Sequence, residues 1–150
     1  RMGVPVSPRN IFPSNIQGLP TWYEVRVSER GWLGRRGGVD LMVAMNPQTW
    51  DADVKEIAAG GYLFYDSTKP LPASKFREDI NILGMPLTQI CNRTYTDARQ
   101  RQLFKNIIYV GALSALLDMD PEAIKKLVAE QYRGKEALLD SNIKAFDMGR

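Results

Sequence analysis

The sequence predicts an α/β fold in three layers, with an open, mostly parallel β-sheet and helices on both of its faces. Two apolar runs, residues 41–45 and residues 62–65, have the composition of strands buried on both faces, which is typical of parallel sheets. A helical pattern separates the two runs, so residues 41–65 are expected to form one strand–helix–strand unit with a right-handed crossover. Helical periodicity then dominates the last third of the chain.

Two more strands are expected near the N-terminus. Residues 4–7 indicate a short strand, and residues 22–28 alternate between apolar and polar side chains, as a half-buried strand near a sheet edge does. Between them, residues 7–20 contain three prolines and a glycine and are expected to be irregular; long irregular segments are often functional. The polar, glycine-rich residues 29–38 are predicted to form a turn.

The helix inside the strand–helix–strand unit is expected to start at Pro47 with Asn46 as its N-cap. Asparagine is favoured at the cap and proline at the first helical position. Gly60–Gly61 would end this helix. Its apolar face would be formed by residues at helical spacing: Trp50, Val54, Ile57 and Ala58.

The rest of the chain is predicted to complete a single domain spanning residues 1–150. The expected elements are a strand at 80–83, helices at 86–92 and 103–117, a helix from Asp120–Pro121 to a break at Gly134, and a last helix carrying Leu139, Ile143 and Phe146. The helix at 103–117 has small residues that permit close packing: Gly111, Ala112, Ser114 and Ala115.

The scarcity of cysteine and histidine excludes several classes of site. Cys91 is the single cysteine, and the chain has no histidine. The chain alone therefore cannot form an intramolecular disulfide, a four-cysteine iron–sulfur cluster, a histidine zinc site or a Ser-His-Asp triad. We predict no catalytic and no metal-binding residue, and we expect Cys91 to be a small buried hydrophobe. Few cysteines fit a cytoplasmic location.

Charge and hydropathy argue against two kinds of partner. The net charge of +3 is small, and no basic stretch has the interleaved aromatics of a nucleic-acid surface. No apolar run approaches the roughly 18 residues that a membrane-spanning helix needs. We therefore expect neither a nucleic acid nor a membrane as a partner.

Candidate ligand- or interface-facing residues follow the predicted central strands. Ligands of open parallel sheets bind beyond the carboxyl ends of the strands, where Asn46, Asp66 and Ser67 lie. Helix capping explains Asn46 equally well, and a turn explains Asp66 and Ser67. Lys105 and Asn106 open an apolar helical run. Lys105 would meet a phosphate or a partner carboxylate there, or else the two residues form the solvated edge of the helix.

The loop after the first strand carries side chains suited to a neutral polar ligand. Ser14, Asn15 and Gln17 donate or accept hydrogen bonds without a fixed charge, and Gly18 allows the backbone to approach closely. A proline-rich connector with local turns is the competing interpretation.

Five segments, in order and spacing, resemble the γ domain of 2-oxoacid:ferredoxin (acceptor) oxidoreductases. They are NIFPSNIQGLPTWYEVRVSERG, DLMVAMNPQTW, GGYLFYDSTKP, MPLTQI and KNIIYVGALSALLDMDPEAI. The resemblance covers nearly the whole chain. FPSNIQG followed by TWYEVRVS is most similar to the version of this domain at the N-terminus of the α subunits of 2-oxoglutarate-type enzymes.

The resemblance implies a non-redox domain of a multisubunit enzyme. Such enzymes cleave a 2-oxoacid with thiamine diphosphate, pass single electrons through a 4Fe-4S cluster to ferredoxin, and form an acyl-CoA. Their thiamine and cluster sites lie in other domains, so the resemblance implies that this chain alone holds no cofactor and that its partners are the remaining α-subunit domains and the β subunit. It also places the domain beside the coenzyme A path.

The chain departs from the family pattern at its start. The family's domain begins with a strand, a Gly-rich turn and a helix, whereas residues 1–3 resemble the end of that helix, with Gly3 as its cap. We therefore expect an N-terminally incomplete domain. The competing hypothesis is an α/β module that binds a nucleotide or coenzyme A without chemistry.

Overall fold

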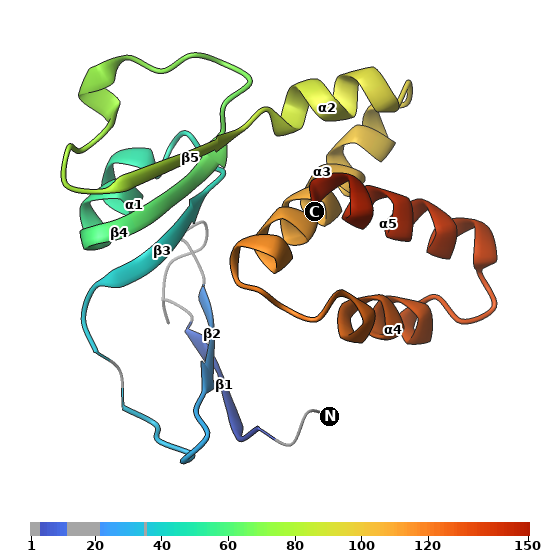
Figure 1. The fold of residues 1–150 in the computed structure, drawn as a ribbon, viewed down its shortest axis with the longest axis horizontal. Helices are drawn as coiled ribbons and strands as arrows, with labels where there is room; N and C mark the ends of the chain where they lie inside the picture. The colour runs from blue at the N-terminus through green and yellow to red at the C-terminus, as the bar shows by residue number, and fades with distance from the viewer. Residues whose placement is uncertain (1–3, 12–21, 35) are drawn as a thin grey trace. The chain divides into compact units, whose positions relative to one another are not determined.

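The computed structural model describes residues 4–11, 22–34 and 36–150. The chain forms two compact units, an N-terminal unit (Arg1–Gly37) and a C-terminal unit (Gly38–Arg150), and each is described by itself. Figure 1 shows the elements of both units along the chain.

The N-terminal unit is built on an antiparallel two-stranded ribbon of β1 (Val6–Ile11) and β2 (Trp22–Val27). The strand predicted at residues 22–28 is confirmed. The irregular segment predicted from residue 7 is wrong for residues 7–11, which belong to β1. Pro8 is tolerated because each strand of a two-stranded ribbon has a free edge, where a missing N–H breaks no ladder.

The apolar face of β2 is more open than the alternation predicted. Tyr23, Val25 and Val27 are 64%, 50% and 57% exposed. Val6 pairs with Val27, so β1 adds another exposed apolar side chain to this face. The predicted half-buried strand is therefore present as a strand, without the burial.

The C-terminal unit contains the parallel sheet that the sequence predicted, with its strands in the order β3–β4–β5. Its strands are β3 (Val39–Ala44), β4 (Ile57–Asp66) and β5 (Asn81–Met85). Ala44 pairs with Tyr65, and Asp66 pairs with Met85. The three strands therefore end at the same edge of the sheet.

Helix α1 (Trp50–Glu56) connects β3 to β4 and is shorter than expected at both ends. The prediction that Asn46 caps a helix starting at Pro47 is wrong. The Asn46 side chain instead accepts a hydrogen bond from the Gln48 N–H (3.0 Å), and Thr49 is the N-cap. Asparagine serves such a local turn as readily as a cap, so the helix starts one turn later.

The Gly60–Gly61 pair lies inside β4 and does not end α1, which corrects a second expectation. Gly60 has a φ of +79°, and a Cβ at Gly61 would lie 2.8 Å from the Ala58 carbonyl oxygen. Glycine is needed here because the start of the strand is irregular, and the β3–β4 register shifts between Val39 and Leu41.

Two hydrophobic cores lie on opposite faces of the sheet, which confirms the three-layer α/β fold. Consecutive residues of β4 separate them: Leu63 belongs to the first core and Phe64 to the second. The first core is formed with α1 and contains Ala44, Trp50, Val54, Ile57, Leu63 and Ile80. The second is formed with helices of the C-terminal half and contains Phe64, Leu87, Cys91, Phe104, Ile108, Ala112 and Ala145. The expectation that Cys91 is a buried hydrophobe is thereby confirmed.

A short 3₁₀ turn η1 (Ala73–Lys75) and four further helices complete the C-terminal unit. The helices are α2 (Leu87–Thr94), α3 (Ala98–Leu116), α4 (Pro121–Gln131) and α5 (Glu136–Gly149). α3 starts five residues before the predicted Leu103, because the Asp97 side chain caps it by accepting from the Gln100 N–H (2.9 Å). α4 starts as predicted, with Asp120 as N-cap and Pro121 as its first residue. Among the described helices, none is long and apolar enough to cross a membrane.

α3 and α5 cross at a contact that admits only glycine on each helix. A Cβ at Gly111 would lie 2.1 Å from the Phe146 carbonyl oxygen, and one at Gly149 would lie 1.8 Å from the Ile108 carbonyl oxygen. The small residues of α3 predicted this close packing, but the partner glycine on α5 was not singled out.

Candidate functional site

The carboxyl edge of the parallel sheet gathers most of the described residues that the sequence singled out. Asn46 follows β3 by two residues, Asp66 ends β4, and Ser67 comes next. The Ser67 N–H donates to the Met85 carbonyl (2.9 Å), which extends the β4–β5 pairing by one step. α2 starts just beyond β5, so its first turn lies at the same edge.

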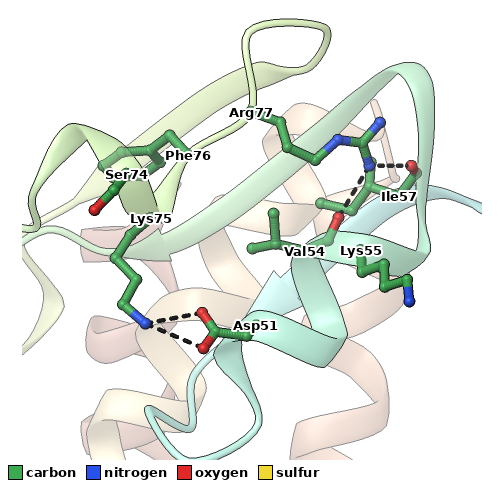
Figure 2. A pocket seen from close by; sticks show the side chains of 8 residues that line it. All are labelled: Asp51, Val54, Lys55, Ile57, Ser74, Lys75, Phe76 and Arg77. Carbon is green, nitrogen blue, oxygen red and sulfur yellow. Dashed lines mark hydrogen bonds and ion pairs between the residues drawn. The ribbon is translucent and has the colours of Figure 1, made fainter.

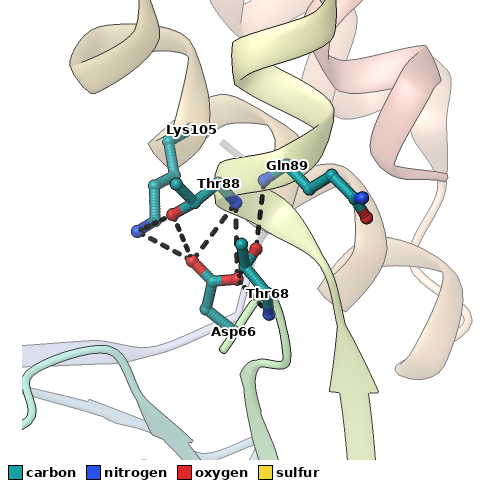
Figure 3. A network of polar contacts seen from close by, with 5 residues as sticks. All are labelled: Asp66, Thr68, Thr88, Gln89 and Lys105. Carbon is teal, nitrogen blue, oxygen red and sulfur yellow. Dashed lines mark hydrogen bonds and ion pairs between the residues drawn. The ribbon is translucent and has the colours of Figure 1, made fainter. Parts of the chain in front are cut away.

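Asp66 is the centre of a polar network at this edge (Figure 3). Its Oδ1 accepts from the Thr68 N–H (3.1 Å) and the Thr68 hydroxyl (2.6 Å). Its Oδ2 accepts from the Thr88 N–H (3.2 Å) and the Thr88 hydroxyl. The Lys105 ammonium, from α3, lies 3.0 Å from Oδ2 and also donates to the Thr88 hydroxyl (2.9 Å).

The network caps the N-terminus of α2 from another part of the chain. Pro86, at the N-cap position, supplies no side-chain hydrogen bond. Asp66 accepts from the Thr88 N–H, and the Thr68 hydroxyl accepts from the Gln89 N–H (3.0 Å). A carboxylate at a helix N-terminus also meets the positive end of the helix dipole. Asp66 and Thr68 therefore accept hydrogen bonds from the first N–H groups of α2, which is the role of a local N-cap residue.

Asp66 stays ionised under all ordinary conditions. Burial raises the pKa of its carboxyl, but hydrogen bonds from Thr68, Thr88 and Lys105 together outweigh burial, so the pKa lies well below its usual range. A carboxylate with this many donors is a poor general base, because protonating it would cost several hydrogen bonds.

The thiol of Cys91, next to this network, is expected to be unreactive. Burial raises the pKa of the Cys91 thiol, with the Lys105 charge opposing and the Asp66 charge adding to the effect. A buried thiol that stays protonated is not a nucleophile. Among the residues that the structure describes, no three His, Cys, Asp or Glu side chains cluster as metal ligands would.

The structure separates the sequence candidates into three groups. It brings Asp66 and Lys105 together in an ion pair within the chain, a contact that the sequence did not predict. Asn46 and Ser67 lie at the same edge without contacting them in any described hydrogen bond, and Asn106 is exposed on α3. The loop candidates lie outside the described residues: Ser14, Asn15, Gln17 and Gly18.

Sequence reasoning missed the two threonines that complete the network. Thr68 and Thr88 stand twenty residues apart, and only the β4–β5 pairing brings them to the same carboxylate. The available signal was a hydroxyl residue directly after the Asp66–Ser67 turn and another in the first turn of the helix after Pro86.

Apart from this network, a hollow of about 320 Å³ lies on the α1 side of the sheet (Figure 2). Two of its three basic residues, Lys75 and Arg77, have partners within the protein, and the third, Lys55, is exposed. Arg77 donates to the Val54 and Ile57 carbonyls at the C-terminus of α1 (3.1 and 2.6 Å), and Lys75 pairs with Asp51 (2.8 Å). Cations at a helix C-terminus are stabilising, so this hollow is explained by the anchoring of the β4–β5 connection.

Arg77 is fixed further by an ion pair with Asp79. The hydrogen bond from the Arg77 side chain is the main reason that the pKa of the Asp79 carboxyl lies below its usual range. The two charges thus anchor each other in the segment that leads into β5, so their ion pair is explained without a ligand.

Two curated proteins match the sequence at modest identity. The ketoisovalerate oxidoreductase subunit VorA of Methanothermobacter thermautotrophicus is 29% identical over 112 residues, covering 73% of this chain and 22% of that protein. The α subunit of 2-oxoacid:ferredoxin oxidoreductase 2 of Aeropyrum pernix is 23% identical over 171 residues, covering 89% of this chain and 27% of that protein. The chain thus spans about a quarter of the length of these relatives.

Solved structures share the fold over almost the whole chain. The 2-oxoglutarate:ferredoxin oxidoreductase of Magnetococcus marinus, solved with 2-oxoglutarate, coenzyme A and succinyl-CoA bound, aligns with a TM-score of 0.72 and 26% identity, covering 98% of this chain and 25% of that chain. The γ subunit of a keto/oxoacid ferredoxin oxidoreductase from Geobacter sulfurreducens aligns with a TM-score of 0.64 and 24% identity, covering 98% of this chain and 79% of that chain; this likeness is one of fold.

The resemblance seen in the five sequence segments is confirmed by these matches. The sequence profile of the pyruvate ferredoxin/flavodoxin oxidoreductase family matches residues 1–150. The match spans the whole chain, and this chain belongs to the pyruvate ferredoxin/flavodoxin oxidoreductase family.

Proposed function

We propose that residues 1–150 form the γ-type domain of a thiamine-diphosphate-dependent 2-oxoacid:ferredoxin oxidoreductase. The enzyme would convert a 2-oxoacid, coenzyme A and oxidised ferredoxin to an acyl-CoA, CO₂ and reduced ferredoxin. The observation that carries this proposal is the family match over the full chain. The 98% overlap with part of a 2-oxoglutarate:ferredoxin oxidoreductase supports the same assignment.

Within that enzyme this chain would have no redox centre. One buried cysteine with a raised pKa, no histidine and an Asp66 locked in hydrogen bonds offer no electron carrier and no general base. Thiamine diphosphate and the 4Fe-4S cluster would lie in the remaining α-subunit domains and the β subunit. These domains would be its partners, with ferredoxin as the acceptor of the assembled enzyme, in the cytoplasm.

Its contribution would be to assembly and to the coenzyme A path. The loop residues Ser14, Asn15, Gln17 and Gly18 carry uncharged groups that suit the amides of pantetheine or a partner's backbone. Asn46, at the carboxyl edge of the sheet, and Asn106, exposed on α3, would face a partner domain or the coenzyme A path. The Asp66–Lys105 network would hold α2 and α3 at that edge.

Reconstitution tests the proposal. The chain is expressed alone and together with the remaining α-subunit domains and the cysteine-bearing β subunit. Iron content and 2-oxoacid-dependent dye reduction with coenzyme A are then measured. We expect no iron and no turnover from the chain alone, and both from a complex that contains it.

Two outcomes would contradict the assignment. Stoichiometric iron or turnover in the chain alone would show that it carries its own redox centre. A monomer that fails to join the other subunits but binds coenzyme A in calorimetry would favour a non-catalytic binding module, for which the ligand-binding edge of a parallel sheet is the supporting feature.

A further inference from the structure

The positive charge of this protein is concentrated in its N-terminal unit. Residues 1–37 contain six arginines, no lysine and two glutamates, a net charge of +4, whereas residues 38–150 contain 14 basic and 15 acidic residues, a net charge of −1. Arginine without lysine is the composition of surfaces that pair with carboxylates through a planar, forked group. This unit therefore has the charge of a surface that meets an acidic partner.

The turn after β2 holds two large apolar side chains in the open. The Gly31 N–H donates to the Ser28 carbonyl (3.0 Å), and the Trp32 N–H donates to the Ser28 hydroxyl (3.3 Å). The Arg26 side chain donates to the Trp32 carbonyl (3.1 Å). With its backbone held at three points, the turn still leaves Trp32 61% and Leu33 75% exposed.

These side chains border a small hollow in the N-terminal unit. The hollow measures about 100 Å³, and its apolar walls are Pro5, Val6, Trp32 and Leu33, with Arg26 beside them. The Arg30 guanidinium lies over the Trp32 ring, 5.8 Å from its centroid. A fixed apolar hollow beside tryptophan and arginine combines the residue types that dominate protein–protein binding energy.

We propose that this hollow is a docking site for an acidic protein surface in the rest of the enzyme. One apolar side chain of the partner would fill the hollow, and carboxylates around it would pair with Arg26 and Arg30, which border it. The proposal rests on the proposed function, because the partner is the catalytic part of the same oxidoreductase. A second copy of this chain is a poor occupant, since its N-terminal unit carries the same charge of +4.

A nucleic acid is also a poor occupant. Phosphates would satisfy the arginines but would leave the walls formed by Trp32, Leu33 and Val6 in contact with a charged backbone. A protein surface satisfies both the charge and the apolar hollow, which is why it is the partner that the site fits.

Two variants of the full chain, each with a matched control, test the proposal. Leu33→Ser removes one wall of the hollow, and its control is Leu138→Ser on α5, where the side chain is 45% exposed. Arg30→Glu reverses one charge of the N-terminal unit, and its control is Arg93→Glu, an exposed residue of the C-terminal unit. Affinity for the remaining subunits is measured by titration in about 50 mM and about 500 mM NaCl.

We expect Leu33→Ser and Arg30→Glu each to weaken association about tenfold or more, and we expect the affinity of Arg30→Glu to depend less on salt than that of the unchanged chain. The two controls should bind like the unchanged chain. Equal affinities for all variants would overturn the docking site while leaving the proposed function intact. Failure of the unchanged chain to associate at all would overturn both.

The assembled enzyme offers a second measurement that does not depend on affinity. Leu33→p-benzoylphenylalanine places a photo-crosslinker at the hollow. Crosslinks to an acidic, apolar surface of another subunit or domain support the proposal. Crosslinks to residues 38–150 of the same chain, to a second copy or to nucleic acid overturn it.

Discussion

Asp66 organises the polar network at the N-terminus of α2. Four protein donors and a lysine surround its carboxylate, and the helix that it caps belongs to a different segment of the chain. A lowered pKa in the folded state contributes stability that is fully present above the unfolded value of about 3.9 and is lost as the pH falls through the folded value. The acid limb of the stability curve should therefore depend on Asp66.

The first prediction follows from this charge. Asp66→Asn keeps the size of the side chain but removes the charge, so it should lower the free energy of unfolding by about 1–3 kcal/mol at pH 7. Urea titrations between pH 7 and pH 2 should show the difference shrinking below about pH 4. Asp51→Asn is the control, because its pair with Lys75 is exposed and should contribute less than about 1 kcal/mol. Equal losses in both variants at pH 7 would mean that the network adds nothing beyond a surface ion pair.

A second prediction at this scale concerns the loop whose structure is not described. Changing Asn15 and Gln17 together to Ala should raise the Michaelis constant for coenzyme A in the assembled enzyme, or weaken subunit association. If these two side chains act on the ligand or at the subunit interface, the melting of the chain itself should change by less than about 0.5 kcal/mol. Unaltered coenzyme A kinetics together with unaltered assembly would reduce the loop to a connector.

Among the elements, α3 and α5 have the most demanding contact. Their backbones approach so closely that a single methyl group at Gly111 would overlap the Phe146 carbonyl. Helices of ordinary composition pack about 8–10 Å apart because side chains keep them there. Glycine on both helices removes that spacer.

Gly111→Ala should therefore destabilise the C-terminal unit. Alanine is the better helix former, so propensity alone would predict a gain, but the methyl group has no space. We expect a loss of about 3 kcal/mol or more, at the upper end of overpacking costs, measured by thermal or denaturant unfolding. Gly34→Ala, where a Cβ would meet nothing within 4 Å, is the control and should be nearly neutral. A stabilised Gly111 variant would show that propensity outweighs the crossing.

The sequence predicted which helices and strands form better than it predicted where they begin and end. Apolar runs identified β3, β4 and β5, and the Asp120–Pro121 signature placed the start of α4. The ends of α1 could not be predicted, because Asn46 suits a turn as well as a cap and Gly60–Gly61 suits a strand irregularity as well as a helix stop. Local residue preferences leave such choices to the tertiary structure.

At the scale of the whole molecule, the family and the fold were accessible from the sequence, but the site was not. Asn46, Asp66 and Ser67 were correctly placed at the carboxyl ends of the strands, and Lys105 was correctly placed on a helix. The partnership between Asp66 and Lys105 needed the register of β4 with β5 and the packing of α3. Contacts between distant segments are set by packing, which no local pattern encodes.

The neighbouring side chains Leu63 and Phe64 have a consequence for how the C-terminal unit unfolds. Each belongs to a different core, so a shift of β4 by one residue would exchange a leucine for a phenylalanine on both faces at once. The cores on the two faces of the sheet can therefore form only with β4 in the same register. Backbone amides of β4 should exchange with solvent with one common free energy of opening, equal to that of global unfolding, and the helices on the two sides should melt in one cooperative transition.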